Sequence, residues 1–212
     1  MNFQTCQLCF RAGFANRLLM ALALIGLLGC EPKPQAPLTA FKSTDITGIP
    51  YAQTFSLTDT TGQKRSLAEF KGKVVVVFFG FTQCPDVCPT TLAELVEVKK
   101  ALGPDGNRLQ AIFITIDPER DTPEVLQTYV TSFDPTFMAL RGSPEETTAV
   151  AKEFKVYFAK VPGKTPESYT MDHSSASYVF DTEGHPRLLV RNGNGVVAWL
   201  SDIQALLGKP SH

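Results

Sequence analysis

The sequence predicts an α/β protein in which a central sheet is covered by helices on both faces. Three observations support this prediction. Residues 74–79 are an unbroken run of β-branched and aromatic residues, typical of a strand buried on both faces. A second apolar run at 111–116 follows, with a helical pattern between the two, as in parallel strands joined by a crossover helix. Further helical patterns and a late pair of strands continue the alternation.

The expected elements begin with a β-hairpin near residues 55–67, where Phe55 and Leu57 flank a polar residue and Thr61-Gly62 supplies a turn. The 74–79 strand comes next, and a helix follows from about Thr90. Pro89 suits the first turn of this helix, because an N–H group there has no partner within the helix. Residues 103–107 are expected to form a loop before the second buried strand.

The second half of the chain carries two strong helix-start signals. Residues 121–124 (DTPE) begin a helix that stops before Asp134, and residues 143–146 (SPEE) begin one that runs to about Tyr157. Residues 160–170 are expected to be a loop, 175–180 and 187–191 a strand pair, and 197–207 the last helix. This order is the layout of a thioredoxin-like three-layer α/β/α fold with an added N-terminal β-hairpin.

Residues 1–29 are predicted to be a targeting segment. Arg11 and Arg17 supply a positive region before an apolar stretch, Leu18–Leu28, that is short for a bilayer span but suits a signal peptide. The stretch ends in Leu27-Leu28-Gly29-Cys30, which resembles a bacterial lipobox, where cleavage precedes the cysteine and its thiol is acylated. An uncleaved N-terminal anchor is the alternative. In both cases the folded part would be exported to the periplasmic side and held at a membrane.

Residues 30–50 are rich in Pro, Lys, Thr and Ala and are predicted to be a flexible tether, with the folded domain at 51–212. The chain has 20 Lys and Arg against 21 Asp and Glu, so it offers no basic stripe for nucleic acid. Of its five cysteines, Cys6 and Cys9 would leave with the signal peptide and Cys30 would be acylated. The domain would keep one pair, which is too few for a disulfide scaffold.

That pair, Cys84 and Cys88, lies between the first buried strand and its helix, where the helix dipole favours thiolate over thiol. If the turn is helical through both residues, the i, i+4 spacing places their Cβ atoms roughly 5–6 Å apart. Such thiols can form a disulfide or share a soft metal ion, namely Cu(I), zinc or the iron of a cluster. A purely structural disulfide is a further interpretation, although a loop this short would gain little stability.

Among the three histidines, His173 is the candidate ligand. His185 is expected in a hairpin turn and His212 ends the chain, so both are interpreted as bystanders. His173 precedes the 175–180 strand, and in a thioredoxin-like layer the loop entering that strand packs beside the cysteine turn. Two thiolates and one imidazole form a ligand set that suits copper, and Asp172 could hold the imidazole in place.

The charged run at 117–121 (DPERD) could also line the site. The favoured interpretation is a capped turn held together by bonds between its carboxylates and Arg120.

Taken together, four motifs resemble the Sco/SenC family. They are Phe79-Gly80-Phe81-Thr82, Cys84-Pro85-Asp86-Val87-Cys88-Pro89, Asp117-Pro118-Glu119-Arg120-Asp121-Thr122 and Asp172-His173-Ser174, within a match from about Phe55 to Leu207. The resemblance implies a thioredoxin-like fold and one copper ion, Cu(I) or Cu(II), bound by Cys84, Cys88 and His173. The chain departs from the family at Gln83, where many members have histidine.

The resemblance also implies a role in assembling the copper-A centre of cytochrome c oxidase. One hypothesis is a monomeric, membrane-tethered copper chaperone serving subunit II of the oxidase and supplied by a periplasmic copper donor or a thiol reductant. A second is a thiol–disulfide oxidoreductase in which Cys84 and Cys88 reduce the acceptor's cysteines. A copper or redox sensor and a zinc site completed by water are further alternatives. His173 separates the first two hypotheses, because thiol exchange does not need an imidazole.

Overall fold

The computed structural model describes residues 41–165 and 168–208. The predicted signal segment, Cys30, most of the predicted tether and His212 lie outside these residues. No helix within the described residues has the length and apolar character needed to cross a membrane.

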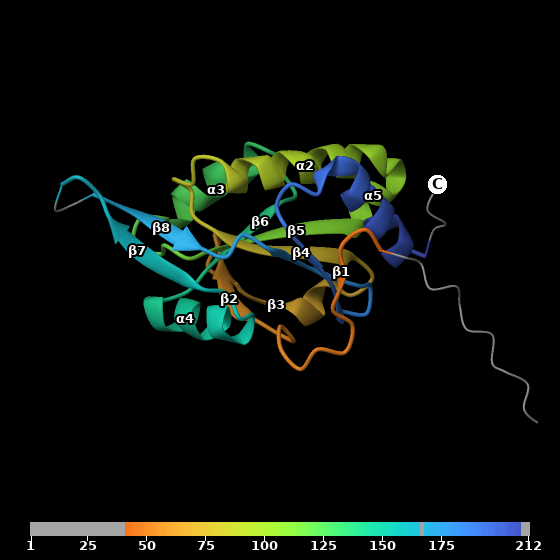
Figure 1. The fold of residues 1–212 in the computed structure, drawn as a ribbon, viewed down its shortest axis with the longest axis horizontal. Coiled ribbons are helices and arrows are strands. Elements are labelled where there is room, and N and C mark those ends of the chain that lie inside the picture. The colour runs from red at the N-terminus through yellow and green to blue at the C-terminus, as the bar shows by residue number, and fades with distance from the viewer. Residues whose placement is uncertain (1–40, 166–167, 209–212) are drawn as a thin grey trace, which may run out of the picture. The chain divides into compact units, whose positions relative to one another are not determined.

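The described strands form one large sheet and one separate hairpin (Figure 1). In spatial order the large sheet contains β1 (Thr44–Asp45), β10 (Pro186–Val190), β9 (Ser177–Phe180), β4 (Val74–Gly80), β5 (Leu109–Thr115), β6 (Met138–Arg141), β2 (Ser56–Asp59) and β3 (Lys64–Ser66). Strands β4, β5 and β6 run parallel, and the remaining pairs are antiparallel. The hairpin consists of β7 (Phe158–Pro162) and β8 (Tyr169–His173).

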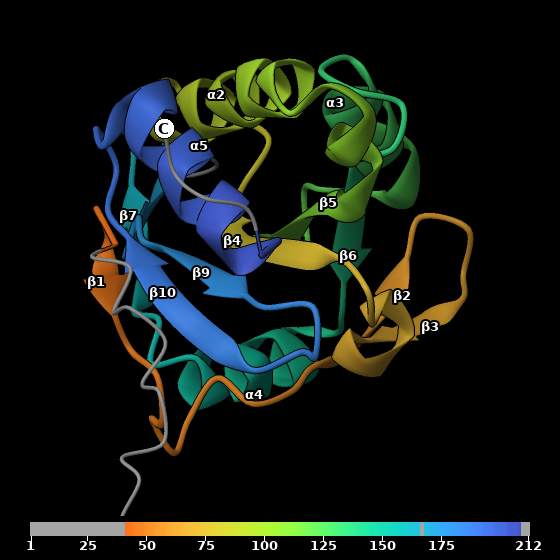
Figure 2. The same cartoon turned by 90° about the vertical axis from the view of Figure 1, so that its right-hand side faces the viewer.

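Helices cover both faces of the large sheet, as predicted. On one face lie α2 (Val87–Ala101), α3 (Pro123–Thr131) and α5 (Gly195–Leu206), and on the other lies α4 (Pro144–Glu153) (Figure 2). The described residues also form two short 3-10 helices, η2 (Leu67–Phe70) and η3 (Gly103–Arg108). Helix η3 covers the whole of the predicted 103–107 loop, so that prediction is corrected.

Strand β4 forms the centre of the core, and all seven of its residues are buried. Because neighbouring side chains on a strand point to opposite faces, the strand contributes to two apolar clusters. Val74, Val76 and Phe78 pack with α2, α3 and α5, whereas Val75, Val77 and Phe79 pack on the face of α4. The prediction of a strand buried on both faces is confirmed.

The predicted helix end at about Tyr157 and the predicted loop at 160–170 are both corrected by the structure. Helix α4 ends at Glu153, because Lys155 has a left-handed φ of 51°. The Val156 N–H group bonds the Ala151 carbonyl at 2.8 Å, which completes a Schellman motif. The chain then enters β7, so residues 160–162 and 169–170 are strand rather than loop. His173 is therefore the last residue of β8 and not part of a loop.

Residues 41–50, which the sequence placed in the tether, are part of the folded domain. The Asp202 carboxylate accepts hydrogen bonds from the backbone N–H groups of Lys42 and Ser43, at 2.7 and 2.9 Å. Strand β1 then pairs with β10, and Ile46 is buried. These contacts are made with α5 and β10 at the far end of the sequence, so the local composition of residues 41–50 gives no sign of them.

Candidate metal centre

The two cysteines lie where β4 passes into α2. Cys84 occupies the connecting turn, is partly exposed, and donates its backbone N–H to the Phe81 carbonyl at 3.1 Å. Cys88 lies in the first turn of α2 and is only 1% exposed. The helix thus includes Cys88 but not Cys84, and both residues are free thiols.

Gly80, at the end of β4, lies directly against Cys88. A Cβ atom at this position would be 2.5 Å from the Cys88 Sγ and 2.7 Å from Cε2 of Phe113. Only glycine therefore lets the sulfur pack so close to the strand. The sequence carried the signal, a glycine ending a bulky apolar strand, which indicates close approach of another group. From the sequence alone, Gly80 is interpreted only as the residue that ends the strand, and its contact with Cys88 is not predicted.

The protonation of the buried sulfur differs from the expectation based on the helix dipole. Burial raises the pKa of the Cys88 thiol, and its hydrogen bond with Cys84 and the charge of Cys84 act in the same direction. Cys88 is therefore a neutral thiol at neutral pH, and its ionisation requires a compensating positive charge such as a metal ion.

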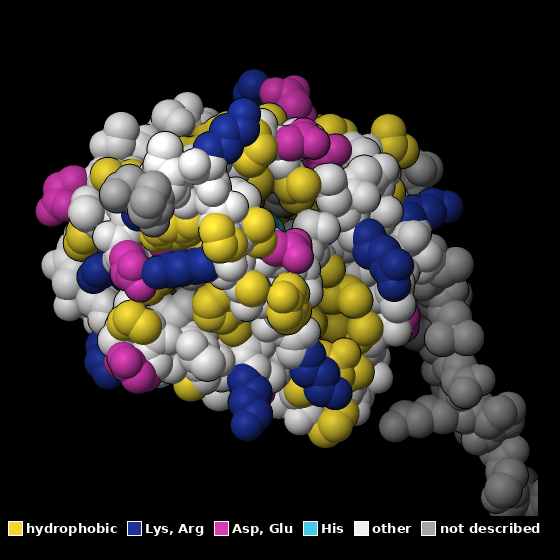
Figure 3. All heavy atoms as spheres, turned by 60° about the vertical axis from the view of Figure 1, so that its left-hand side comes forward, with side chains coloured by type: hydrophobic (Ala, Val, Ile, Leu, Met, Phe, Trp, Pro, Cys, Tyr) yellow, Lys and Arg dark blue, Asp and Glu magenta, His cyan; other side chains and the backbone are white. Residues whose placement is uncertain are grey.

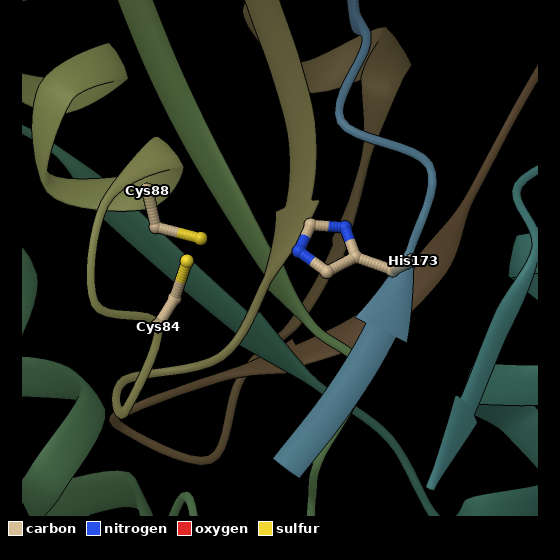
Figure 4. A group of neighbouring side chains, drawn as sticks. All are labelled: Cys84, Cys88 and His173. Atoms are coloured by element: carbon tan, nitrogen blue, oxygen red, sulfur yellow. The ribbon is translucent and has the colours of Figure 1, made fainter. Parts of the chain in front are cut away.

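His173 faces the thiols from β8 (Figure 4). Its Nδ1 atom lies 2.8 Å from the Ser174 carbonyl oxygen, and its ring meets the Phe81 ring edge-on at a centroid distance of 6.0 Å. A carbonyl oxygen can only accept a hydrogen bond, so Nδ1 must carry the proton. The Nε2 lone pair is then free, which is the state needed to bind a metal ion.

The structure brings together the three predicted residues, Cys84, Cys88 and His173, with one ligand atom from each lying within 4.8 Å of the others. Zinc–thiolate bonds are about 2.3 Å long, so three ligands around one ion lie about 4 Å apart. Closing the site onto an ion thus requires movements below about 1 Å. On the face shown in Figure 3, a hollow in the surface is bordered by apolar side chains and by acidic ones.

Asp172 does not support the imidazole as predicted. It is exposed and precedes His173 on the same strand, so its side chain points to the opposite face. The Ser174 carbonyl takes the role that was expected of Asp172. His185 has 72% of its side chain exposed, and its Nδ1 lies 3.6 Å from Oδ1 of Asp181.

The 117–121 run forms the predicted capped turn and also contacts the cysteine turn. Arg120 pairs with Asp117 within the run. The buried Asp121 carboxylate accepts hydrogen bonds from the hydroxyl groups of Thr82 and Thr115, each at 2.6 Å, and from the Thr82 N–H group. Burial raises the pKa of Asp121, while these hydrogen bonds act in the opposite direction. Asp121 therefore fixes the start of the turn that carries Cys84.

Comparison with known proteins agrees with this geometry. The SCO1/SenC family model matches residues 44–208. The chain belongs to the SCO1/SenC family. The resemblance found in the sequence is thereby confirmed.

Other SCO1/SenC proteins match most of the chain. The SCO2-like protein of Rickettsia felis is 36% identical over 168 residues, covering 79% of this chain and 82% of that protein. The structure of Bradyrhizobium japonicum ScoI with copper bound is 41% identical, with a TM-score of 0.66 over 73% of this chain and 98% of that chain. The apo Sco1 protein of Thermus thermophilus is 38% identical, with a TM-score of 0.71 over 81% of this chain and 100% of that chain. These neighbours confirm the thioredoxin-like fold.

Proposed function

We propose that this protein is a copper chaperone that carries one copper ion on Cys84, Cys88 and His173 and acts in cytochrome c oxidase assembly. The observation that carries the proposal is the convergence of two sulfurs and one imidazole within 4.8 Å. Thiolate and imidazole are ligands that suit copper, and a family member of similar sequence was solved with copper bound.

Each ligand has a distinct part in taking up the ion. Nδ1 of His173 donates to the Ser174 carbonyl, so in the neutral ring Nε2 is the nitrogen that offers its lone pair to the ion. Cys88, whose pKa burial raises, must release a proton when the metal binds. Copper affinity should therefore increase with pH, as for any site built on thiols that are protonated when empty.

An acceptor should reach the bound ion from the side of Cys84. This cysteine is partly exposed, whereas Cys88 is buried against β4. An acceptor thiolate can thus approach on the Cys84 side while Cys88 still holds the ion. The acceptor we propose is the copper-A domain of cytochrome c oxidase subunit II, with a periplasmic copper donor loading the chaperone.

The proposed location is the periplasmic face of a membrane, with the protein a monomer attached through a lipid on Cys30 or an uncleaved N-terminal anchor. The lipobox-like Leu27-Leu28-Gly29-Cys30 and the apolar stretch before it support this proposal. The folded domain would then be held near membrane-bound oxidase subunits.

A second candidate function is reduction of the acceptor's disulfide, and the pairing of a partly exposed thiol with a buried one favours it. The Cys84 thiolate would attack the acceptor disulfide and displace one acceptor thiolate. Cys88, after losing its proton, would then attack the Cys84 sulfur and release the second acceptor thiolate. The products are a reduced acceptor and a Cys84–Cys88 disulfide. A redox or copper sensor would use the same pair.

Anaerobic titration of the reduced protein with Cu(I) tests the proposal. His173→Ala should lower copper affinity by at least roughly 100-fold, since even residues behind the ligands contribute about 10–100-fold, and should leave dithiol oxidation nearly unchanged. His185→Ala is the matched control and should bind copper as the wild type does. Cys84→Ser and Cys88→Ser should abolish both activities. Wild-type copper affinity in His173→Ala would defeat the chaperone function and favour the oxidoreductase.

A further inference from the structure

The histidine ligand lies on a hairpin that shares no backbone ladder with the rest of the described fold. Strands β7 and β8 pair only with each other, whereas β4, which leads to the cysteines, is in the large sheet. Figure 1 shows the hairpin projecting beyond that sheet. Residues 174–176 join His173 to β9, which pairs with β4. The distance from His173 to the two sulfurs is therefore set by this short connection together with the side-chain contacts between the hairpin and the cysteine turn.

Arg120 makes such a contact with both partners at once. Its Nη1 atom donates to the Gln83 side-chain oxygen at 3.1 Å and to the Tyr169 carbonyl oxygen at 2.8 Å. Gln83 immediately precedes Cys84, and Tyr169 is the first residue of the strand that ends in His173. One guanidinium thus bridges the two segments that supply the ligands.

The guanidinium is itself held firmly. Its Nε bonds one carboxylate oxygen of the buried Asp117, whose other oxygen accepts the Tyr169 hydroxyl at 2.8 Å. The guanidinium carbon lies 3.7 Å from the centre of the Tyr169 ring and 6.0 Å from that of Phe81. Phe81 in turn meets the His173 ring edge-on. Stacking and fork-shaped hydrogen bonding of this kind are specific to arginine.

A second contact between the hairpin and the 117–121 turn, an ion pair, can be compared with the Arg120 network. Lys160 of β7 pairs with Glu119 at 2.7 Å, but about half of each side chain is exposed. Exposed pairs of this kind contribute little, typically below about 1 kcal/mol. The partly buried Arg120 network is therefore the stronger connection between the hairpin and the 117–121 turn.

We propose that Arg120 is a positioning residue that holds the β7–β8 hairpin against the cysteine turn and thereby sets the distance between His173 and the two thiols. This inference rests on the proposed copper function, in which His173 is a ligand. The alternative is that Arg120 only stabilises its own turn through Asp117. The two roles differ in whether the effect of Arg120 on copper binding passes through His173.

A double-mutant cycle on the reduced full-length protein distinguishes these roles. Arg120→Met should lower Cu(I) affinity by roughly 10–100-fold, the range for residues that orient ligands. In the His173→Ala background the same substitution should cause no further loss. Lys160→Met, on the same hairpin, is the matched control and should change affinity less than about threefold. If Arg120→Met folds poorly, Arg120→Lys should give a smaller loss that again disappears without His173.

A second readout needs no copper. In the apo protein, amide hydrogen exchange at residues 169–173 should be faster in Arg120→Met than in the wild type or Lys160→Met, while exchange in β4 stays unchanged. Unchanged exchange at 169–173, wild-type copper affinity, or an equal loss in the His173→Ala background would overturn the inference. If instead the wild type binds no copper, the proposed function fails, and the exchange experiment still tests whether Arg120 holds the hairpin.

Discussion

Substitution of Gly80 by alanine offers the sharpest test of how the buried sulfur is held. The added methyl group would lie 2.5 Å from the Cys88 Sγ and 2.7 Å from Cε2 of Phe113. Favourable contacts between such atoms are about 3.5–4.0 Å, so the neighbours must retreat by roughly 1 Å. Phe113 is 1% exposed and packs edge-on against Phe78, so it has little room to move. The displacement should therefore fall mainly on Cys88.

Two consequences can be estimated. Overpacking of this kind typically lowers the free energy of unfolding by about 1–3 kcal/mol. Metal sites tolerate errors in ligand distance of only about 0.2 Å, so a movement of roughly 1 Å should disturb binding. We expect Gly80→Ala to lose at least about tenfold in Cu(I) affinity, equivalent to about 1.4 kcal/mol.

Gly142→Ala is the matched control. Its methyl group would meet Cβ of Glu146 at 2.8 Å and Cδ2 of Leu57 at 2.9 Å, in contacts that involve none of the three ligands. Urea unfolding of the apo protein and competition titration with Cu(I) measure both effects. Both variants should lose stability, but only Gly80→Ala should lose copper affinity. Wild-type affinity in Gly80→Ala would refute the packing of Cys88 against β4.

Two further predictions concern protonation. Burial alone would raise the pKa of Asp59, but hydrogen bonds from Thr61 and Arg65 help to lower it from 3.8 to about 2. A lowered carboxyl pKa stabilises the fold above the unfolded-state value, and this stabilisation is lost as the pH falls from 3.8 toward 2. Asp59→Asn should thus be less stable than the wild type by about 2 kcal/mol at pH 6. Urea unfolding should show this difference in the free energy of unfolding becoming smaller toward pH 2. A difference that does not change with pH would contradict the lowered pKa of Asp59. Iodoacetamide at neutral pH should label Cys84 before Cys88, because Cys88 is buried and burial raises its pKa; equal labelling in peptide mapping would count against this.

The features that the sequence predicts correctly depend on local patterns. Thr122 caps α3 by accepting a hydrogen bond from the Val125 N–H group at 3.3 Å, and Ser143 forms a capping box with Glu146 at the start of α4. The uniform apolar composition of β4 likewise indicates burial on both faces without knowledge of its neighbours.

The features that were missed are stabilised by distant partners or lack their usual residue. Strand β6 is only four residues long, and pairing with β5 and β2 determines its conformation more than its own composition does. Helix α4 ends at Glu153, and Lys155 takes the left-handed position after it, where glycine is the usual signal. The β7–β8 hairpin was expected as a loop because prolines and a glycine lie within it.

In the candidate site, too, some features follow from local sequence and others depend on distant partners. The three ligands could be predicted, because cysteine and histidine carry chemistry that few other residues offer. Asp172 was assigned wrongly because His173 lies within a strand, where adjacent side chains point in opposite directions. The bridging role of Arg120 was missed because its partners Gln83 and Tyr169 lie 37 and 49 residues away in sequence.

The three ligands come from the cysteine turn with α2 and from the separate β7–β8 hairpin, and this division has a consequence for transfer of the metal ion. A chaperone must hold copper tightly and still release it, and releasing a ligand is easiest where few interactions have to break. Cys88 is fixed by α2 and by its contact with β4, whereas His173 is on a hairpin joined to the cysteine turn mainly by side chains such as Arg120. Loss of the imidazole would thus break no hydrogen bond of the large sheet, and local opening of this kind costs much less than global unfolding. Arg120→Met should accordingly speed transfer of copper to an acceptor while weakening its binding, and a slower transfer in stopped-flow measurements would contradict this account of release.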